Sequence, residues 1–213
     1  MNKDILDSAL SYVREKFENE YSGHDYFHTL RVYRMAMRIG EGEGADLETV
    51  GLAALLHDVD DRKISPETYE KQVNASSFLA SRGVAEERID RICKIIREIS
   101  FSANDSPPST KEGKCVQDAD RLDAIGAIGI GRAFAYGGSH NRHMHHPDIK
   151  PNMDMTKDEY VKSESTTVNH FYEKLFRLKE LMNTSTAKDI AKGREIYMRE
   201  FIDEFLCEWE GKR

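Results

Sequence analysis

Histidine and aspartate stand next to each other at the end of a strongly apolar stretch. The segment LLHDVDD, residues 55–61, places His57 beside Asp58 and follows them with Asp60 and Asp61. A neighbouring imidazole and carboxylate at the edge of a core can form half of a metal site, because both are ligands for divalent transition metals. A run of acids at a helix end is more often a solvated surface, so this segment alone leaves both readings open.

A second segment, GHDYFHTLRV, contributes two more imidazoles. His24, His28 and Arg31 recur at three- and four-residue spacings, so they share one face if the segment is helical. His28 is a candidate metal ligand, although a single helical histidine is more often packed or solvated. His24 is a candidate for lining the pocket, with a capping or packing role as the alternative.

The segment QDADRLD supplies carboxylates. Asp120 and Asp123 share a helical face, whereas Asp118 lies about 200° round the helix from Asp120 and points elsewhere. Small residues at positions 124 and 127 continue the Asp120 face and leave room there for an ion or substrate. The alternative is a solvent face in which Asp118 pairs with Arg121 at a helical i,i+3 spacing.

Helical periodicity dominates the whole chain, and we predict an all-α protein. Asp46 is a good N-cap for the helix that ends at His57, and Ser22 is a candidate cap for the helix carrying His28. We expect helices over residues 3–18, 22–39, 47–57, 65–83, 86–99 and 111–136. Pro66 would lie in the first turn of the fourth of these. Two more helices are expected after residue 157, separated at Asn183–Thr184.

No internal repeat or clear linker divides the sequence. We therefore predict one compact domain over residues 1–213, with a motif core at about 22–136 and C-terminal helices at about 157–210. Residues 137–156 read as a long polar loop before those helices. Its cluster of His140, His143, His145 and His146 lacks regular ligand spacing, so we interpret the loop as a mobile lid. The last helix carries an apolar stripe, Met198, Phe201, Ile202, Phe205 and Trp209, expected in the core.

Composition narrows the class of protein. The 213 residues are 39% hydrophobic and 32% charged, with a formal net charge of −7. An acidic chain repels phosphate backbones, so we expect no nucleic-acid polymer as partner. Three widely spaced cysteines argue against a disulfide framework. We expect a soluble cytoplasmic protein with no signal peptide and no membrane association.

Taken in order, His28, then His57–Asp58, then Asp120 spell H…HD…D. With the flanking words GHDYFHTLRV, LAALLHDVDD and VQDADRLDAIGAIGIGRAF, the chain resembles the HD-domain metal-dependent phosphohydrolases, in particular the small single-domain bacterial branch typified by YpgQ and YedJ. The similarity extends into NHFYEKLFRLKELMNT. It implies a helical HD-domain bundle and one divalent metal ion (Mn, Ni, Co, Fe, Zn or Mg) held by His28, His57, Asp58 and Asp120.

The resemblance also implies roles around the metal. Asp58 would help fix the attacking water, and Asp61 stands where several HD hydrolases carry a glutamate near that water. The alternative for Asp61 is a solvated helix-end acid, which is also our interpretation of Asp60. Candidate substrate contacts are His24, Arg31, Arg121 and Lys174, each of which could instead pair or pack locally.

Two positions depart from relatives. Arg62 stands where the stringent-nucleotide hydrolases have a second acid, and Ile99 where some relatives have histidine. Arg62 weakens the assignment to the stringent-nucleotide hydrolases, and Ile99 weakens the case for a second metal ion.

The resulting hypothesis is a phosphohydrolase that uses attack by metal-bound water on a phosphate ester or anhydride of a nucleotide or similar small molecule. Pyrophosphohydrolase, phosphatase and phosphodiesterase activities remain open. The alternative is a non-catalytic sensor module that binds metal and nucleotide. The sequence is compatible with a homodimer and does not decide the assembly.

Overall fold

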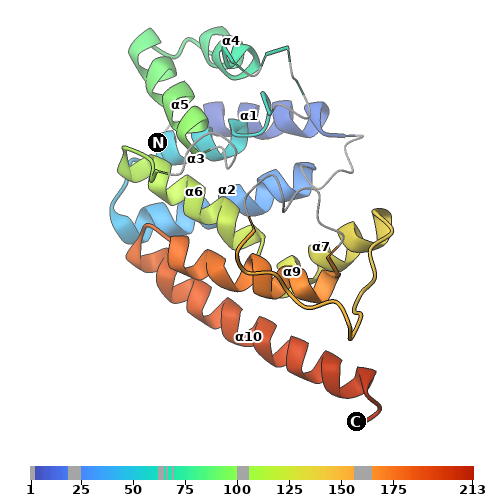
Figure 1. Ribbon diagram of the computed structural model, residues 1–213. Coiled ribbons are helices and arrows are strands. Elements are labelled where there is room, and N and C mark those ends of the chain that lie inside the picture. Colours follow the sequence, from blue (N-terminus) through green and yellow to red (C-terminus); the bar gives the residue numbers. More distant parts are fainter. Residues whose placement is uncertain are drawn as a thin grey trace. The chain divides into compact units, whose positions relative to one another are not determined.

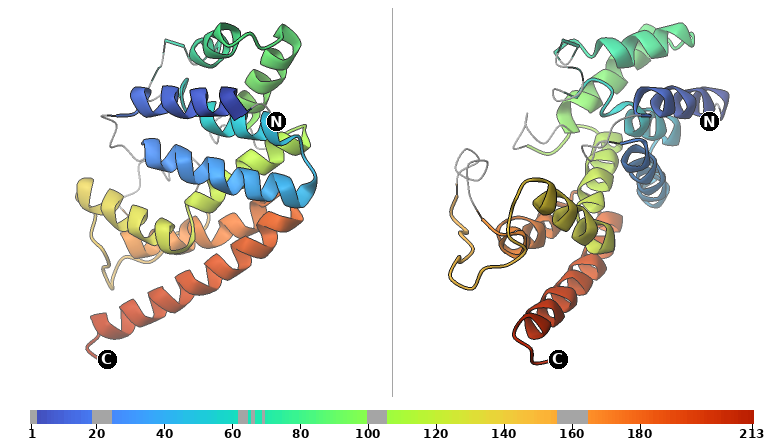
Figure 2. Two further views of the ribbon diagram at one scale, coloured as in Figure 1. Left: turned by 180° about the vertical axis from the view of Figure 1, so that it is seen from behind. Right: turned by 90° about the vertical axis from the view of Figure 1, so that its right-hand side faces the viewer.

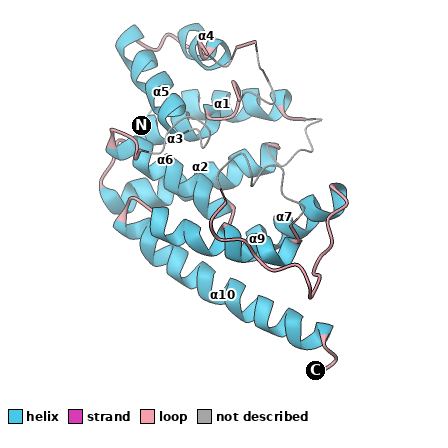
Figure 3. Ribbon diagram, viewed as in Figure 1, coloured by secondary structure: helices cyan, strands magenta, loops and turns pink. Residues whose placement is uncertain are grey.

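A computed structural model describes residues 3–18, 25–61, 65, 67–68, 70–99, 106–155 and 165–213. Within these ranges the chain forms helices and loops but no strand, so the predicted all-α fold class is confirmed (Figure 3). No helix there is both long and apolar enough to cross a membrane. The chain divides into two compact units: Met1–Asp120 with Asn183–Ala187, and Arg121–Met182 with Lys188–Arg213.

The first unit is arranged around one apolar helix. Its elements are α1 (Lys3–Lys16), α2 (Tyr26–Glu43), α3 (Leu47–Leu56), α4 (Val73–Ser81), α5 (Glu86–Ile99) and α6 (Lys111–Asp123) as far as Asp120 (Figure 1). In α3 every residue from Thr49 to Leu56 is buried. This helix packs against α1, α2 and α5, while α4 packs against α5 (Figure 2). The HD pair thus follows directly on the most buried helix of the unit.

Carboxylate caps fix where two of these helices begin. The Asp46 side chain accepts a hydrogen bond from the Glu48 backbone N–H at 3.2 Å, which confirms the predicted cap of α3. For α2 the cap is Asp25, which accepts from the His28 backbone N–H at 2.6 Å. Our choice of Ser22 was therefore wrong, and Ser22 itself lies outside the described residues. Capping by Asp25 places His28 in the first turn of α2.

Two helices differ from their predicted bounds. α4 begins at Val73 rather than near residue 65, because Gln72 before it has a left-handed backbone with φ of 52°. The predicted helix over 111–136 is two helices, α6 and α7 (Gly126–Ser139). Between them Ile125 is extended and Gly126 has φ of 78°, a conformation that glycine adopts without a steric penalty.

The second unit contains α7, α9 (Thr167–Glu173), the 3₁₀ helix η1 (Leu175–Leu181) and α10 (Ser185–Trp209) from Lys188 onward. Asn183–Thr184 does separate the last two helical segments, as predicted. Of the apolar stripe of α10, Met198 and Ile202 are buried and Phe201 and Phe205 are half-buried, but Trp209 is exposed, so its placement in the core was wrong. Phe134 of α7 lies against Phe171 of α9, with ring centroids 6.1 Å apart. Aromatic packing therefore joins the helices of this unit.

The His-rich segment is tied to α9. The Thr167 backbone N–H donates to the His143 carbonyl at 3.0 Å, and the Val168 N–H to the Met144 carbonyl at 2.9 Å. Further along, the Asn169 side chain donates to the Ile149 carbonyl at 2.9 Å. These bonds hold residues 143–149 against the start of α9, which is the arrangement of an anchored strap rather than of the mobile lid that we expected.

Candidate metal centre

His28 reaches the site from the first turn of α2. Its ring is buried, with an exposed fraction of 2%. Its Nε2 atom lies 3.5 Å from Asp58 Oδ2 and 3.4 Å from Asp120 Oδ1. Because α2 begins at Tyr26, the backbone of His28 is held by the Asp25 cap while its ring faces two carboxylates.

His57 closes α3 and is oriented by the helix that it closes. Its Nδ1 atom lies 2.8 Å from the Ala54 carbonyl oxygen, so Nδ1 carries the proton in that contact and Nε2 is left available as a ligand atom. His57 Nε2 lies 3.2 Å from Asp58 Oδ2. A backbone carbonyl that fixes the tautomer of a histidine is the usual partner of a metal ligand.

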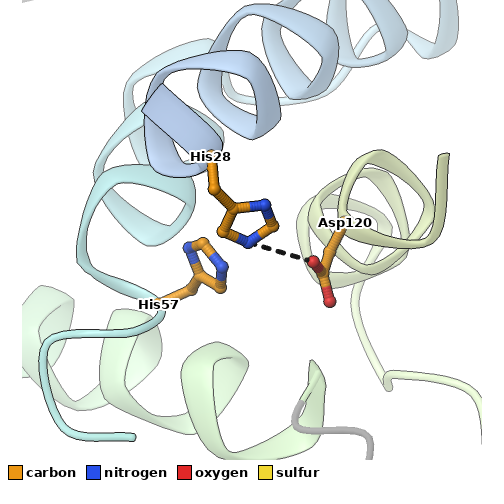
Figure 4. A group of neighbouring side chains, drawn as sticks. All are labelled: His28, His57 and Asp120. Carbon is orange, nitrogen blue, oxygen red and sulfur yellow. Dashed lines mark ion pairs between the residues drawn. The ribbon is translucent and has the colours of Figure 1, made fainter. Parts of the chain in front are cut away.

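The carboxylates come from two different elements. Asp58 follows His57 in the turn after α3 with 9% of its side chain exposed, whereas Asp120 lies on α6 with 36% of its side chain exposed. One ligand atom each from His28, His57 and Asp120 lie within 4.8 Å of one another. Figure 4 shows these three side chains turned toward a common point from α2, the end of α3 and α6.

The electrostatics of the cluster favour positive charge. Burial by itself would lower the pKa of His57, but the carboxylates of Asp58 and Asp120 outweigh it and raise that pKa to about 9. The two carboxylates thus stabilise a cation at the His57 ring. A divalent metal ion would take the place of the proton.

The residues present fit such an ion. His57 Nε2 is buried and faces the Asp58 carboxylate at 3.2 Å without a well-formed hydrogen bond, so it can offer its lone pair to a cation. Two imidazole nitrogens and two carboxylates make a mixed nitrogen and oxygen set that suits Mn²⁺, Fe²⁺, Co²⁺, Ni²⁺ or Zn²⁺. His28, His57, Asp58 and Asp120 together could therefore hold one divalent cation.

The other two acids of the HDVDD segment differ from each other. Asp60 is only 1% exposed and accepts from the backbone N–H groups of Asn74 at 3.0 Å and Ala75 at 2.9 Å. It therefore caps the start of α4, and our interpretation of Asp60 as a solvated acid was wrong. Asp61 lies at the end of the same turn, where its N–H donates to the Asp58 carbonyl, and its catalytic role stays a prediction.

Asp118 has a structural role that the sequence did not reveal. It is completely buried and accepts from the backbone N–H groups of Asn183 and Thr184, both at 2.8 Å. We had considered a solvent-facing pair of Asp118 with Arg121; complete burial rules out a solvated Asp118. Its separation from the Asp120 face, predicted from helical geometry, agrees with these contacts.

The four predicted substrate contacts lie in different parts of the chain. Arg31 lies in α2, three residues after His28, and is half-buried. Arg121 and Lys174 belong to the second unit, where the Arg121 guanidinium donates to the Leu181 carbonyl. His24 lies outside the described residues. A role in binding substrate stays a prediction for all four.

The four histidines of the His-rich segment do not form a comparable cluster. Among the residues that the structure describes, only His28, His57 and Asp120 meet the geometry for three or more metal-binding side chains. His140 instead stacks on Tyr136 with ring centroids 3.8 Å apart, and His145 packs edge-on against Trp209. Packing of these rings accounts for part of the histidine content of the segment.

Comparison with known proteins places this geometry in a family. The HD domain matches residues 25–125, which include all four candidate ligands. The chain is 39% identical to the uncharacterized protein YpgQ of Bacillus subtilis over 196 residues, covering 90% of this chain and 87% of YpgQ.

Solved structures agree with that match. A protein from Lactobacillus plantarum is 40% identical with a TM-score of 0.83, and an HD-superfamily hydrolase from Bacillus thuringiensis is 39% identical with a TM-score of 0.81; each comparison covers 99% of both chains. Bacillus subtilis YpgQ in complex with ADP aligns over 95% of this chain and 93% of its own, with 36% identity and a TM-score of 0.76.

Proposed function

The chain belongs to the HD-domain family, and from this membership we propose that it is a divalent-metal-dependent phosphohydrolase that cleaves a phosphate ester or anhydride of a nucleotide. The observation that carries the proposal is the convergence of His28, His57, Asp58 and Asp120 from α2, α3 with its following turn, and α6. Acidic and imidazole side chains this close together can hold a cation, and a bound cation can promote phosphoryl hydrolysis.

The four residues would hold one divalent ion. Bound there, the ion supplies a Lewis acid that lowers the pKa of water and offsets negative charge on a phosphoryl group. The Ala54 carbonyl keeps the His57 ring in place through Nδ1. Asp58, beside that ring, also accepts a hydrogen bond from the attacking water, and Asp61 takes its proton.

A nucleotide is the substrate class that the comparisons favour, because YpgQ has been crystallised with ADP. A nucleotide phosphate also needs fixed positive charge in an acidic protein. Arg31, one turn beyond His28, supplies it from the helix that carries a ligand. His24, Arg121 and Lys174 are the further substrate contacts in this proposal.

One set of assays tests the proposal. Metal content is measured on the purified protein, and Mn²⁺-dependent hydrolysis is screened over nucleoside mono-, di- and triphosphates and cyclic nucleotides. Wild type, Asp58→Asn and Asp61→Asn are compared with Asp189→Asn, a control in which the acid is exposed on α10. Asp58→Asn should lose metal and activity, Asp61→Asn should keep metal but lose rate, and Asp189→Asn should behave as wild type.

Two outcomes would contradict the proposal. Equal activity in wild type and Asp58→Asn would remove the metal cluster from the reaction. Tight nucleotide binding by a metal-loaded wild type that hydrolyses no member of the panel would identify a sensor module instead.

A further inference from the structure

Residues 183–187, which lead into α10 and form its first turn, contact two helices that carry metal-site residues. Residues 183–187 belong to the first unit, together with α2 and with α6 up to Asp120. α2 contributes His28 and α6 contributes Asp120 to the cluster. Contacts between this turn and the two helices therefore bear on how the cluster is assembled.

On the α6 side the contact is a buried network around Asp118. Asn183 donates to its carboxylate from the backbone and from the side-chain amide, both at 2.8 Å. Thr184 donates from the backbone at 2.8 Å and from its hydroxyl at 2.7 Å. The same hydroxyl oxygen accepts from the Ala187 N–H at 3.3 Å, so Thr184 caps α10 while it binds Asp118.

On the α2 side the contact is made by the last residue of the helix. Glu43 Oε1 accepts from the Thr186 N–H at 2.9 Å, the Thr186 hydroxyl at 2.7 Å and the Ser185 hydroxyl at 2.9 Å. The Thr186 N–H and hydroxyl hold the pKa of the Glu43 carboxyl below its usual value. A Cβ at Gly42 would lie only 2.7 Å from Thr186 Oγ1, so the turn approaches α2 as closely as a glycine allows.

Two further hydrogen bonds anchor the beginning of α6, one to the end of α2 and one to the cap of α3. The Lys111 ammonium group donates to the Glu43 carbonyl at 2.9 Å, and Glu112 accepts from the Asp46 N–H at 3.2 Å. Asp120 lies nine residues beyond Lys111, roughly 14 Å along the helix. Asp118, two residues before Asp120, is where α6 is held near the cluster.

We propose that residues 183–186 form a clip that sets the position of Asp120 relative to His28, with Asp118 and Thr184 as positioning residues for metal binding. The clip holds α6 through Asp118, two residues before Asp120, and ties it to the last residue of α2 through Glu43, so loosening it lets Asp120 move relative to His28. The inference rests on the proposed function in one respect: it takes the cluster to be a metal site.

Two threonine caps provide a matched test. Thr184→Ala removes both the α10 cap and the hydroxyl that binds Asp118. Thr166→Ala removes an equivalent cap, the Thr166 hydroxyl that accepts from the Asn169 N–H at 3.1 Å, from a helix of the second unit that carries no ligand. Thr184→Ser keeps the hydroxyl and serves as the rescue variant.

Mn²⁺ alone is titrated into each variant by calorimetry. We expect Thr184→Ala to weaken Mn²⁺ binding roughly ten-fold, the size typical of groups that orient ligands. Thr184→Ser and Thr166→Ala should bind as wild type. Equal losses in Thr184→Ala and Thr166→Ala, or no loss in either, would overturn the clip. If Thr184→Ala fails to fold, Thr186→Val, which removes the hydroxyl bound to Glu43, takes its place with the same expectation.

Crystal structures of metal-free wild type and Thr184→Ala separate failure of the clip from failure of the proposed function. The distance from His28 Nε2 to Asp120 Oδ1, here 3.4 Å, should lengthen in the variant. An unchanged distance would overturn the clip even if wild type binds Mn²⁺. A wild type that binds no Mn²⁺ would overturn the proposed function, while a lengthened distance would still support the clip.

Discussion

Two carboxylates of α6, only two residues apart, are satisfied in opposite ways. Asp118 is completely buried and receives backbone and side-chain donors from both Asn183 and Thr184. Asp120 is a third exposed and faces the Nε2 atom of His28. An acid whose oxygens are filled by the chain stabilises the fold, whereas an acid left facing imidazole nitrogens has oxygens to offer a cation.

The largest effect should come from Asp118→Asn. The amide would turn one acceptor into a donor that faces the donors of Asn183 and Thr184, leaving buried polar groups unpaired. We expect a loss of about 4 kcal/mol in the free energy of unfolding, measured by urea denaturation without metal. Saturating Mn²⁺ should not restore it. Normal stability combined with lost metal binding would show that Asp118 belongs to the metal site, and the distinction between Asp118 and Asp120 would be wrong.

The complementary change is Asp58→Asn. Without added metal the variant should lose the stability that the Asp58 carboxylate gives to the protonated His57 ring, so the effect of metal is read as the Mn²⁺-induced shift within each protein. Mn²⁺ at about a hundred times its Kd should stabilise wild type by about 2.7 kcal/mol and the variant not at all. Activity should fall by more than about 100-fold, since a ligand matters more than a group that only orients one. An equal Mn²⁺ shift in both proteins would contradict the assignment.

A third titratable group, His170, sharpens the comparison because its half-buried ring is held in the neutral form. Burial, with Lys174 and Arg142 nearby, lowers the pKa of His170 to about 4. Between pH 6.5 and 4 the unfolded chain takes up a proton that the folded chain does not, so stability falls as pH falls through this window. Relative to His170→Gln, wild type should lose about 1–2 kcal/mol between pH 8 and 5 in urea unfolding. Parallel pH profiles would show that His170 is not held neutral.

The smallest effect concerns how tightly the clip meets α2. Gly42→Ala puts a Cβ 2.7 Å from Thr186 Oγ1, whereas nothing lies within 4 Å of a Cβ at Gly131 in α7. Helix propensity alone favours alanine by about 0.5–1 kcal/mol at both positions. We expect Gly131→Ala to raise the melting temperature and Gly42→Ala to lower it. A higher melting temperature in both variants would show that Thr186 moves away from the new Cβ without a cost in stability.

Local sequence was sufficient for the cluster and for one helix cap. His28, His57–Asp58 and Asp120 could be identified by their order and flanking residues, and Asp46 by its position before an apolar helix. The roles of Asp118 and Asp60 could not, because their partners lie 65 and 14 residues away along the chain. Periodicity reports which face is apolar and carries no information on which distant N–H group an acid will meet.

The break between α6 and α7 was missed for a related reason. The run DAIGAIG contains glycines, which can end a helix, but its small and apolar residues continue the helical pattern and we predicted one helix. In the fold Gly126 adopts φ of 78°, and a Cβ there would lie 3.0 Å from the Arg194 side chain. The positive φ that ends the helix is one that glycine adopts without a steric penalty, and the close approach of Arg194 leaves no room for a side chain there.

The cap that Asp60 gives to α4 links the stability of this helix to that of the turn that holds His57 and Asp58. The N-cap residue of α4, Gln72, makes no side-chain capping bond, and the Asn74 and Ala75 amides depend on a carboxylate from the turn after α3. The helix is nine residues long, too short to be stable alone in water. We therefore expect its amides to open to hydrogen exchange together with the turn that holds His57 and Asp58, and an ion bound at the HD pair to slow exchange in a helix that contributes no ligand to it.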